Sequence, residues 1–476
     1  MKILYYLFIA ALISLTCVNT TDVYAKDGLS VKLKVKGVQD TLCYLAYHYG
    51  HKIFIHDTFP INDKGVAHLK ANEELPDGIY LAVLPGKQFF EFLLTKNEQK
   101  FTIETDTSDF INKMKVTGSN ENKLFNDYQR FLFYNQQKIK TVKTRFDLTE
   151  HDDSLAIFKD DITELELELN EYRKKIIEKN EDSFLAAIFK TMSEPEVPEE
   201  IKNKKEQTLN LQYYKIHFWD NIDFNDERLI RTPIIYNKIK QYLEKLTVKM
   251  PDSINVAVDV ILTKAKVNDK AFRYALSYIT HTYETSKIMG MDAVFVHLAQ
   301  KYYLNGDASW MDSLSIVKVK ERVERLKYNL IGKIAPELKM TNLNGTGKQS
   351  LHEIKAEYVL MLFWDYDCGH CKKQMPEFLA LYDRFKKEGL EVYAVCNKIE
   401  KEKIDKYIDE NKLIWINVYD PDYKVPFRQW YDIHSTPTTY LLDKDKKIVA
   451  KRLGVAQITN ILEQAFKEKE IKKEDQ

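Results

Sequence analysis

One stretch of this chain, residues 358–371, reads YVLMLFWDYDCGHC. Its first seven residues are all apolar, which is typical of a strand that is buried on both faces in the centre of a sheet. Residues 368–387 follow with the periodicity of a helix. Cys368 and Cys371 are therefore expected where a buried strand ends and a helix begins.

A thiol at the start of a helix is well placed to react. The free N–H groups and the positive end of the helix dipole favour Cys368 as a thiolate, which is the nucleophilic form. Cys371 is three residues further on, on the same helical face and within disulfide reach. We therefore predict a catalytic pair in which Cys368 attacks and Cys371 resolves, with this redox-active disulfide in place of a cofactor.

The neighbours of the two cysteines are predicted to tune their redox potential. His370 can add positive charge near the Cys368 sulfur, which stabilises the reduced thiolate and makes the disulfide more oxidising. Asp367 acts in the opposite direction, but solvent screens an exposed carboxylate well. We rank His370 and the helix terminus above Asp367, and Gly369 completes the redox-tuning set.

The C-x-x-C spacing also occurs in zinc sites. It supplies only two ligands, and a structural zinc site requires a second pair at similar spacing. The chain contains no second C-x-x-C and no H-x-x-x-H. The pattern therefore favours redox use, and we predict no metal site.

Strands and helices alternate from residue 331 onward. Further strands are expected at residues 391–396, 414–418, 438–442 and 448–451, and further helices near 400–410 and 457–467. This order predicts an α/β domain over residues 329–476.

Several motifs in this region resemble the thioredoxin superfamily. They are the CGHC motif, Phe363-Trp364 before it, Pro376 in the following helix, and Thr436-Pro437 before a strand. The segments GKIAPEL at 332–338 and PTTYLLD at 437–443 are similar to those of extracytoplasmic thiol-disulfide oxidoreductases of the TlpA/ResA type.

This resemblance implies a thioredoxin-like fold with a cis-proline at Pro437, beside the active-site disulfide. Backbone next to that proline pairs with the substrate chain in this family, so Thr436, Pro437 and Trp364 are expected to form the substrate groove. The resemblance also implies protein thiols and disulfides as substrates, and an upstream redox partner in the membrane.

The chain departs from related families at four positions. Leu362 stands where thioredoxins keep a buried Asp, and Gln374 stands where several TlpA-like proteins have a Glu. The motifs therefore do not assign a group that takes the proton from Cys371. Asp365 and Met361 replace the Thr and Pro that peroxiredoxins require, which argues against a peroxidase.

The region upstream of residue 329 predicts two further domains. Val31, Leu33 and Val35 alternate with lysines, and similar patterns between turn signals predict an antiparallel, β-sandwich-like domain over residues 26–115. Residues 116–328 have helical periodicity and predict an all-α domain that begins with a helix capped by Ser119 or Asn120. Both regions resemble domains of unknown function that precede thioredoxin-like modules in secreted proteins of the Bacteroidetes.

The first 25 residues are predicted to be a secretory signal peptide. Lys2 precedes an apolar run over residues 3–15, and residues 23–25 read VYA, so cleavage is expected after Ala25. The apolar run is shorter than the ~20 residues that span a membrane. The protein is therefore expected in the periplasm. Lipid attachment at Cys17 is the minority alternative, because the SLT that precedes it differs from the usual LAG.

Charge indicates no partner. The 71 basic residues equal the 71 acidic residues, so no global field attracts nucleic acid, and we predict no nucleic-acid partner.

The sequence thus predicts a periplasmic thiol-disulfide oxidoreductase that exchanges disulfides with proteins through its CGHC pair. The direction of electron flow is open, although His370 favours the oxidising half of the known range. The alternative is a non-catalytic adaptor that binds a peptide or polymer and uses the thioredoxin-like fold as a platform. Only the reactivity of the thiols separates the two readings.

Overall fold

The computed structural model describes residues 28–147, 152–202, 207–345 and 347–474. The predicted signal peptide, its cleavage site after Ala25, and Cys17 lie outside these residues. The chain divides into two compact units, the first ending at Tyr242 and the second beginning at Leu243. The predicted domain boundaries at 115/116 and 328/329 remain predictions.

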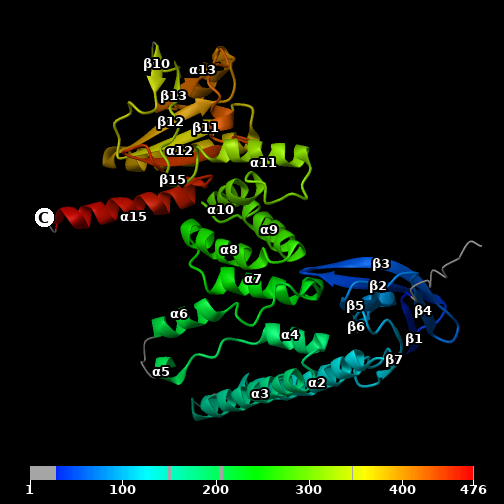
Figure 1. Ribbon diagram of the computed structural model, residues 1–476. Coiled ribbons are helices and arrows are strands. Elements are labelled where there is room, and N and C mark those ends of the chain that lie inside the picture. Colours follow the sequence, from blue (N-terminus) through cyan, green and yellow to red (C-terminus); the bar gives the residue numbers. More distant parts are fainter. Residues whose placement is uncertain (1–27, 148–151, 203–206, 346, 475–476) are drawn as a thin grey trace, which may run out of the picture. The chain divides into compact units, whose positions relative to one another are not determined.

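The first unit begins with an eight-stranded sheet, drawn in blue in Figure 1. The strand order is β6-β5-β2-β3-β4-β1-β7-β8. The strands are β1 (Ser30–Lys36), β2 (Thr41–Tyr49), β3 (Lys52–Ile61), β4 (Val66–Lys70), β5 (Gly78–Val83), β6 (Phe89–Leu94), β7 (Lys100–Asp106) and β8 (Lys115–Thr117).

The alternation in β1 has the predicted effect, because Val31, Leu33 and Val35 are buried in the core of this sheet. The antiparallel prediction is correct for every pair of this sheet except β1 with β7, which run parallel. Parallel pairing requires a long connection between the two strands, and here five strands intervene. The hydrogen bonds also join all eight strands into one sheet, where a sandwich has two.

Helices follow the sheet, as predicted. Ser119 caps the first of them, accepting a hydrogen bond from the N–H of Asn122 at 3.0 Å. α2 and α3 lie side by side (Figure 1). The α-helices before the division are α2 (Asn120–Asp147), α3 (Asp152–Lys179), α4 (Phe184–Met192), α5 (Glu199–Lys202) and α6 (Gln207–His217), and α7 (Ile234–Lys245) spans it.

The second unit contains further α-helices and a seven-stranded sheet. The helices before the sheet are α8 (Pro251–Ala265), α9 (Asp269–Glu284), α10 (Asp292–Leu298) and α11 (Ser313–Leu326). The strands are β9 (Lys339–Asn342), β10 (Lys348–Ser350), β11 (Tyr358–Trp364), β12 (Leu390–Cys396), β13 (Ile416–Tyr419), β14 (Thr438–Asp443) and β15 (Ile448–Lys451). The remaining helices are α12 (Gly369–Phe385), α13 (Lys401–Asn411), α14 (Phe427–Trp430) and α15 (Val455–Glu474).

β11 is an interior strand of this sheet, in the order β10-β9-β13-β12-β11-β14-β15. It pairs parallel with β12 and antiparallel with β14. Leu360 and Leu362 pack on the face covered by α12 and α15, and Met361 and Phe363 pack on the face covered by α14. An apolar residue is therefore required at every position of β11, which is the pattern seen in the sequence. This is the predicted thioredoxin-like α/β architecture.

None of the described helices combines the length and the apolar character needed to cross a membrane.

Candidate active site

The two cysteines occupy the predicted junction between strand and helix. β11 ends at Trp364, α12 begins at Gly369, and Cys368 is the residue that caps the helix. Cys368 is half-buried, whereas Cys371 is only 1% exposed. The structure holds both as free thiols. A bulky substrate can therefore reach the first sulfur but not the second.

A segment far along the chain completes the surroundings of Cys368. The peptide bond between Thr436 and Pro437 is cis, as the family resemblance implies, and both residues are half-buried. The Cys368 thiol donates to the carbonyl oxygen of Thr436 at 3.2 Å. The predicted groove residues Thr436 and Pro437 thus lie beside the reactive cysteine.

Burial and hydrogen bonding oppose each other at Cys368. Burial on its own would raise the pKa of this thiol, but several hydrogen bonds together lower the pKa below the ordinary value of 9.0. The strongest of these comes from the side chain of Thr436, and the others come from Cys371 and from the backbone of His370. Since all of these favour the charged sulfur, Cys368 is activated by the helix start and the cis-proline loop together.

Cys371 has the opposite character. Burial raises the pKa of its thiol to about 12, so Cys371 is a neutral thiol at physiological pH. Leu362, which replaces the buried acid of thioredoxins, is fully buried.

The predicted redox-tuning residues are all exposed, and each lies close to Cys368 in the chain. His370 acts on the pKa of Cys368 through its backbone N–H. The carboxylate of Asp367 lies 3.8 Å from Lys398, which also lies 3.6 Å from Asp365. Lys398, which the sequence analysis missed, therefore offsets part of the negative charge beside the pair. A side chain at Gly369 would meet no atom within 4 Å, so sterics do not require glycine there.

Trp364 does not fit its predicted place in the substrate groove. Its side chain is fully buried, and its ring packs on that of Tyr407 with centroids 5.2 Å apart. The side chain points with Leu360 and Leu362 into the core beneath α12, because alternate residues of a strand share a face. Trp364 therefore supports the active-site helix from below.

The region that contains the two cysteines is similar to known protein families. Residues 331–451 match the AhpC/TSA family. The thiol-disulfide oxidoreductase ResA of Bacillus cereus is 32% identical over 124 residues, which are 26% of this chain and 70% of the relative. This chain belongs to the ResA-like thiol-disulfide oxidoreductases. ResA of Geobacillus kaustophilus is 30% identical over 118 residues, covering 25% of this chain and 66% of that protein.

The upstream parts of this ResA-like chain match two families of unknown function, DUF4369 over residues 29–125 and DUF5106 over residues 166–329. Among solved structures, a domain of a possible thiol-disulfide isomerase from Cytophaga hutchinsonii is 37% identical. The match covers 30% of this chain and 97% of that domain, with a TM-score of 0.28. A thioredoxin-like protein from Bacteroides caccae is 21% identical over 57% of this chain and 97% of its own, with a TM-score of 0.45.

Two further cysteines lie among the described residues. Cys43 in β2 and Cys396 in β12 are both free and buried, and burial raises the pKa of each to about 12. Within the described ranges, no group of three or more His, Cys, Asp or Glu side chains could hold a metal ion.

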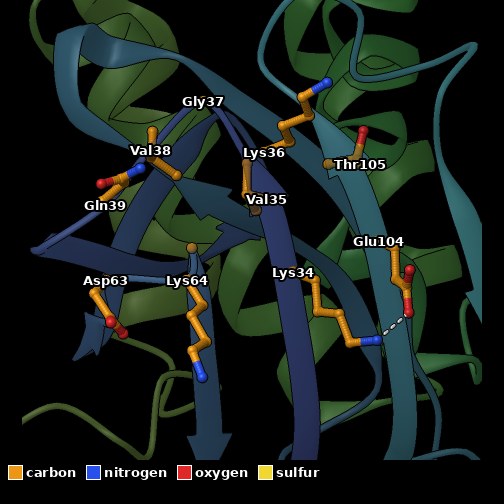
Figure 2. A pocket seen from close by; sticks show the side chains of 11 residues that line it. Lys34, Val35, Lys36, Gly37, Val38, Gln39, Asp63, Lys64, Glu104 and Thr105 are labelled. Atoms are coloured by element: carbon orange, nitrogen blue, oxygen red, sulfur yellow. Dashed lines mark hydrogen bonds and ion pairs between the residues drawn. The ribbon is translucent and has the colours of Figure 1, made fainter.

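A polar pocket lies at the end of β1 and the loop that follows it (Figure 2). Lys34 on β1 and Glu104 on β7 form an ion pair at its edge, and Lys36 and Lys64 also line it. The lining carries charge but no cysteine, so it adds nothing to the redox chemistry.

Proposed function

We propose that this protein is a periplasmic thiol-disulfide oxidoreductase that exchanges disulfides with protein substrates through Cys368 and Cys371. The observation that carries the proposal is the asymmetry of the pair. Cys368 is accessible with a lowered pKa beside Thr436, and Cys371 is buried with a pKa of about 12.

The reaction begins from the reduced pair. The Cys368 thiolate attacks one sulfur of a substrate disulfide, the substrate S–S bond breaks, and the other substrate sulfur leaves as a thiolate. Cys371 then attacks the Cys368 sulfur of the mixed disulfide and gives up its proton, and the second substrate sulfur leaves. One substrate thiolate takes the Cys371 proton, and the other takes a proton from solvent.

Two electrons thus pass from the protein to the substrate, and the reverse sequence oxidises a substrate dithiol. A redox partner in the membrane would restore the starting state in either direction. We place the couple in the oxidising half of the range of roughly −270 to −120 mV, because groups that stabilise the Cys368 thiolate favour the reduced protein. Equilibration with a series of glutathione buffers measures this potential, and a value below about −300 mV would instead indicate a structural disulfide.

The order of attack is tested by trapping covalent partners. Cys371→Ala leaves Cys368 able to form a mixed disulfide that no neighbour resolves, so it should retain substrate proteins that a reductant releases. Cys368→Ala leaves only the buried thiol and should trap few or none. Equal trapping by both variants would contradict the order, and no trapping by either would favour the non-catalytic adaptor.

The periplasmic location rests on the first 25 residues of the sequence. N-terminal sequencing of the protein from the periplasmic fraction should begin at Lys26. A lipid-modified Cys17 at the N-terminus would replace this proposal with a membrane-anchored protein.

A further inference from the structure

A buried carboxylate lies just ahead of the cis-proline loop. Asp432 is 2% exposed and follows α14 with a left-handed backbone, φ 48°. Its side chain has three cationic or potentially cationic partners. Arg322 Nη1 lies 2.7 Å away, His434 Nε2 lies 2.8 Å away, and Arg452 also forms an ion pair with it. A fully buried carboxylate is stable only when it is paired in this way.

Asp432 fixes one end of the loop that faces Cys368. The N–H of the next residue, Ile433, donates to the carbonyl of Arg428 at 2.9 Å. At the other end, the hydroxyl of Thr438 donates to the carbonyl of Ser435 at 2.7 Å. The span between these anchors contains Thr436, whose carbonyl accepts from the Cys368 thiol and whose side chain lowers the pKa of that thiol. A shift of Asp432 would therefore be passed to Thr436 over only four residues.

Arg322 comes from outside the thioredoxin-like region. It lies in the C-terminal half of α11, within the segment that matches the DUF5106 family. Through its guanidinium, α11 supplies one of the ion-pair partners of Asp432.

Other contacts hold the end of α11 and the residues after it against the same sheet. The side chain of Asn329 donates to the carbonyl of Trp430 at 2.9 Å, and it accepts from the buried Lys451 at 3.0 Å. Lys451 also donates to the carbonyl of Asn329 at 2.7 Å and to the carboxylate of Asp292 at 2.5 Å. This polar network holds the residues that follow α11 against the sheet, on both sides of the family boundary.

We propose that Arg322 is a positioning residue for disulfide exchange, which holds Asp432 so that the following loop keeps Thr436 against Cys368. This inference rests on the proposed function and deepens it, because it gives the helical segment a part in building the active site. Arg452 remains paired with Asp432 when Arg322 is removed, so the loss of Arg322 should loosen the loop without leaving the carboxylate unpaired.

The test compares Arg322→Ala with Arg322→Lys in the full chain. A matched control is Arg325→Ala, which removes an exposed arginine from the next turn of the same helix. The readout is the rate of Cys368 alkylation by iodoacetamide between pH 5 and 9, since the midpoint of this profile reports the thiolate and not the overall fold.

Arg322→Ala should move the midpoint upward by about half a pH unit, which lowers alkylation about threefold on the acidic side of the profile. Arg322→Lys retains a charge without the planar fork, so its midpoint should lie between those of Arg322→Ala and the unchanged protein. Arg325→Ala should leave the profile unchanged. If circular dichroism shows that Arg322→Ala does not fold, the midpoint of the Arg322→Lys alkylation profile tests the positioning role instead.

Midpoints of Arg322→Ala and Arg322→Lys equal to that of the unchanged protein would overturn the positioning role. The proposed function would stand in that case if Cys371→Ala still trapped partners. Absence of trapping together with a shifted midpoint would instead overturn the proposed function, and with it the role in disulfide exchange, while showing that Arg322 positions the loop beside Cys368.

Discussion

The two cysteines of the pair should be alkylated at very different rates at pH 7. The pKa of Cys368 is lowered below 9.0, whereas burial raises the pKa of Cys371 to about 12. A thiol with a pKa of 9.0 is about 1% thiolate at pH 7, and a thiol with a pKa of about 12 is about 0.001% thiolate. The thiolate fraction of Cys368 should therefore exceed that of Cys371 by at least about 1000-fold.

Intrinsic nucleophilicity reduces this difference. A thiolate of higher pKa attacks faster, with a Brønsted coefficient of about 0.4 to 0.5, which over three pKa units corresponds to roughly 15- to 30-fold. The remaining preference for Cys368 is at least about 30- to 60-fold. The near-complete burial of Cys371 should widen the ratio further, because the reagent must also reach the sulfur.

The assay is a short pulse of iodoacetamide on the reduced full-length chain, followed by quenching and tandem mass spectrometry. Fragmentation distinguishes Cys368 from Cys371 within one peptide. Cys43 and Cys396 are buried thiols with raised pKa values and serve as internal references, which should label slowly until urea is added. Equal early labelling of Cys368 and Cys371, or faster labelling of Cys371, would refute the assigned roles.

Two further predictions concern the charges around the site. His370→Pro should make the couple more reducing by about 20 to 45 mV, the equivalent of about 1 to 2 kcal/mol, since it removes both the imidazole and the N–H that faces Cys368. Glutathione equilibration measures the change, and His370→Ala, which keeps the N–H, shows how much of it the imidazole causes. Arg452 and Arg322 help to lower the pKa of the buried Asp432 to about 2, so this group contributes stability above its ordinary pKa of 3.8 and loses it as the pH falls through about 2. Urea unfolding at pH 5 and pH 2 should show a loss of about 2 kcal/mol from this group that is absent in Asp432→Asn, and an equal loss in both proteins would contradict the pairing.

The sequence predicted the elements whose signals are local. β11 spans the seven apolar residues of the opening stretch, and Cys368 caps the following helix as the motif indicates. The cis bond before Pro437 followed from the family resemblance and is confirmed. These features depend on neighbouring residues or on a short motif, so a single sequence contains the information needed to predict them.

The features that the sequence predicted wrongly or missed are side-chain directions, strand pairings and ion pairs that no local pattern specifies. Trp364 is the last residue of an apolar strand, and only the packing of the sheet determines that its ring faces the core. The parallel pairing of β1 with β7 depends on how five intervening strands are arranged. Arg322 and Asp432 are 110 positions apart, and neither belongs to a motif, so their ion pair appears only when the chain is folded.

The proton of Cys371 limits how the pair can work. Thioredoxins place an acid beneath the second cysteine, but here Leu362 fills that position in the core. The neutral Gln374 replaces the Glu of several relatives. In the proposed cycle the thiolate that leaves the substrate can accept this proton, and its ordinary pKa of about 8.5 is below the pKa of about 12 that Cys371 has in the reduced pair. Proton transfer to it is therefore uphill, whereas the first attack by Cys368 needs no such transfer. In the proposed cycle, resolution should be slower than attack, so the mixed disulfide at Cys368 should be the longest-lived intermediate. The substrate would then remain bound beside Thr436 during that time, on the loop that we propose Arg322 helps to position.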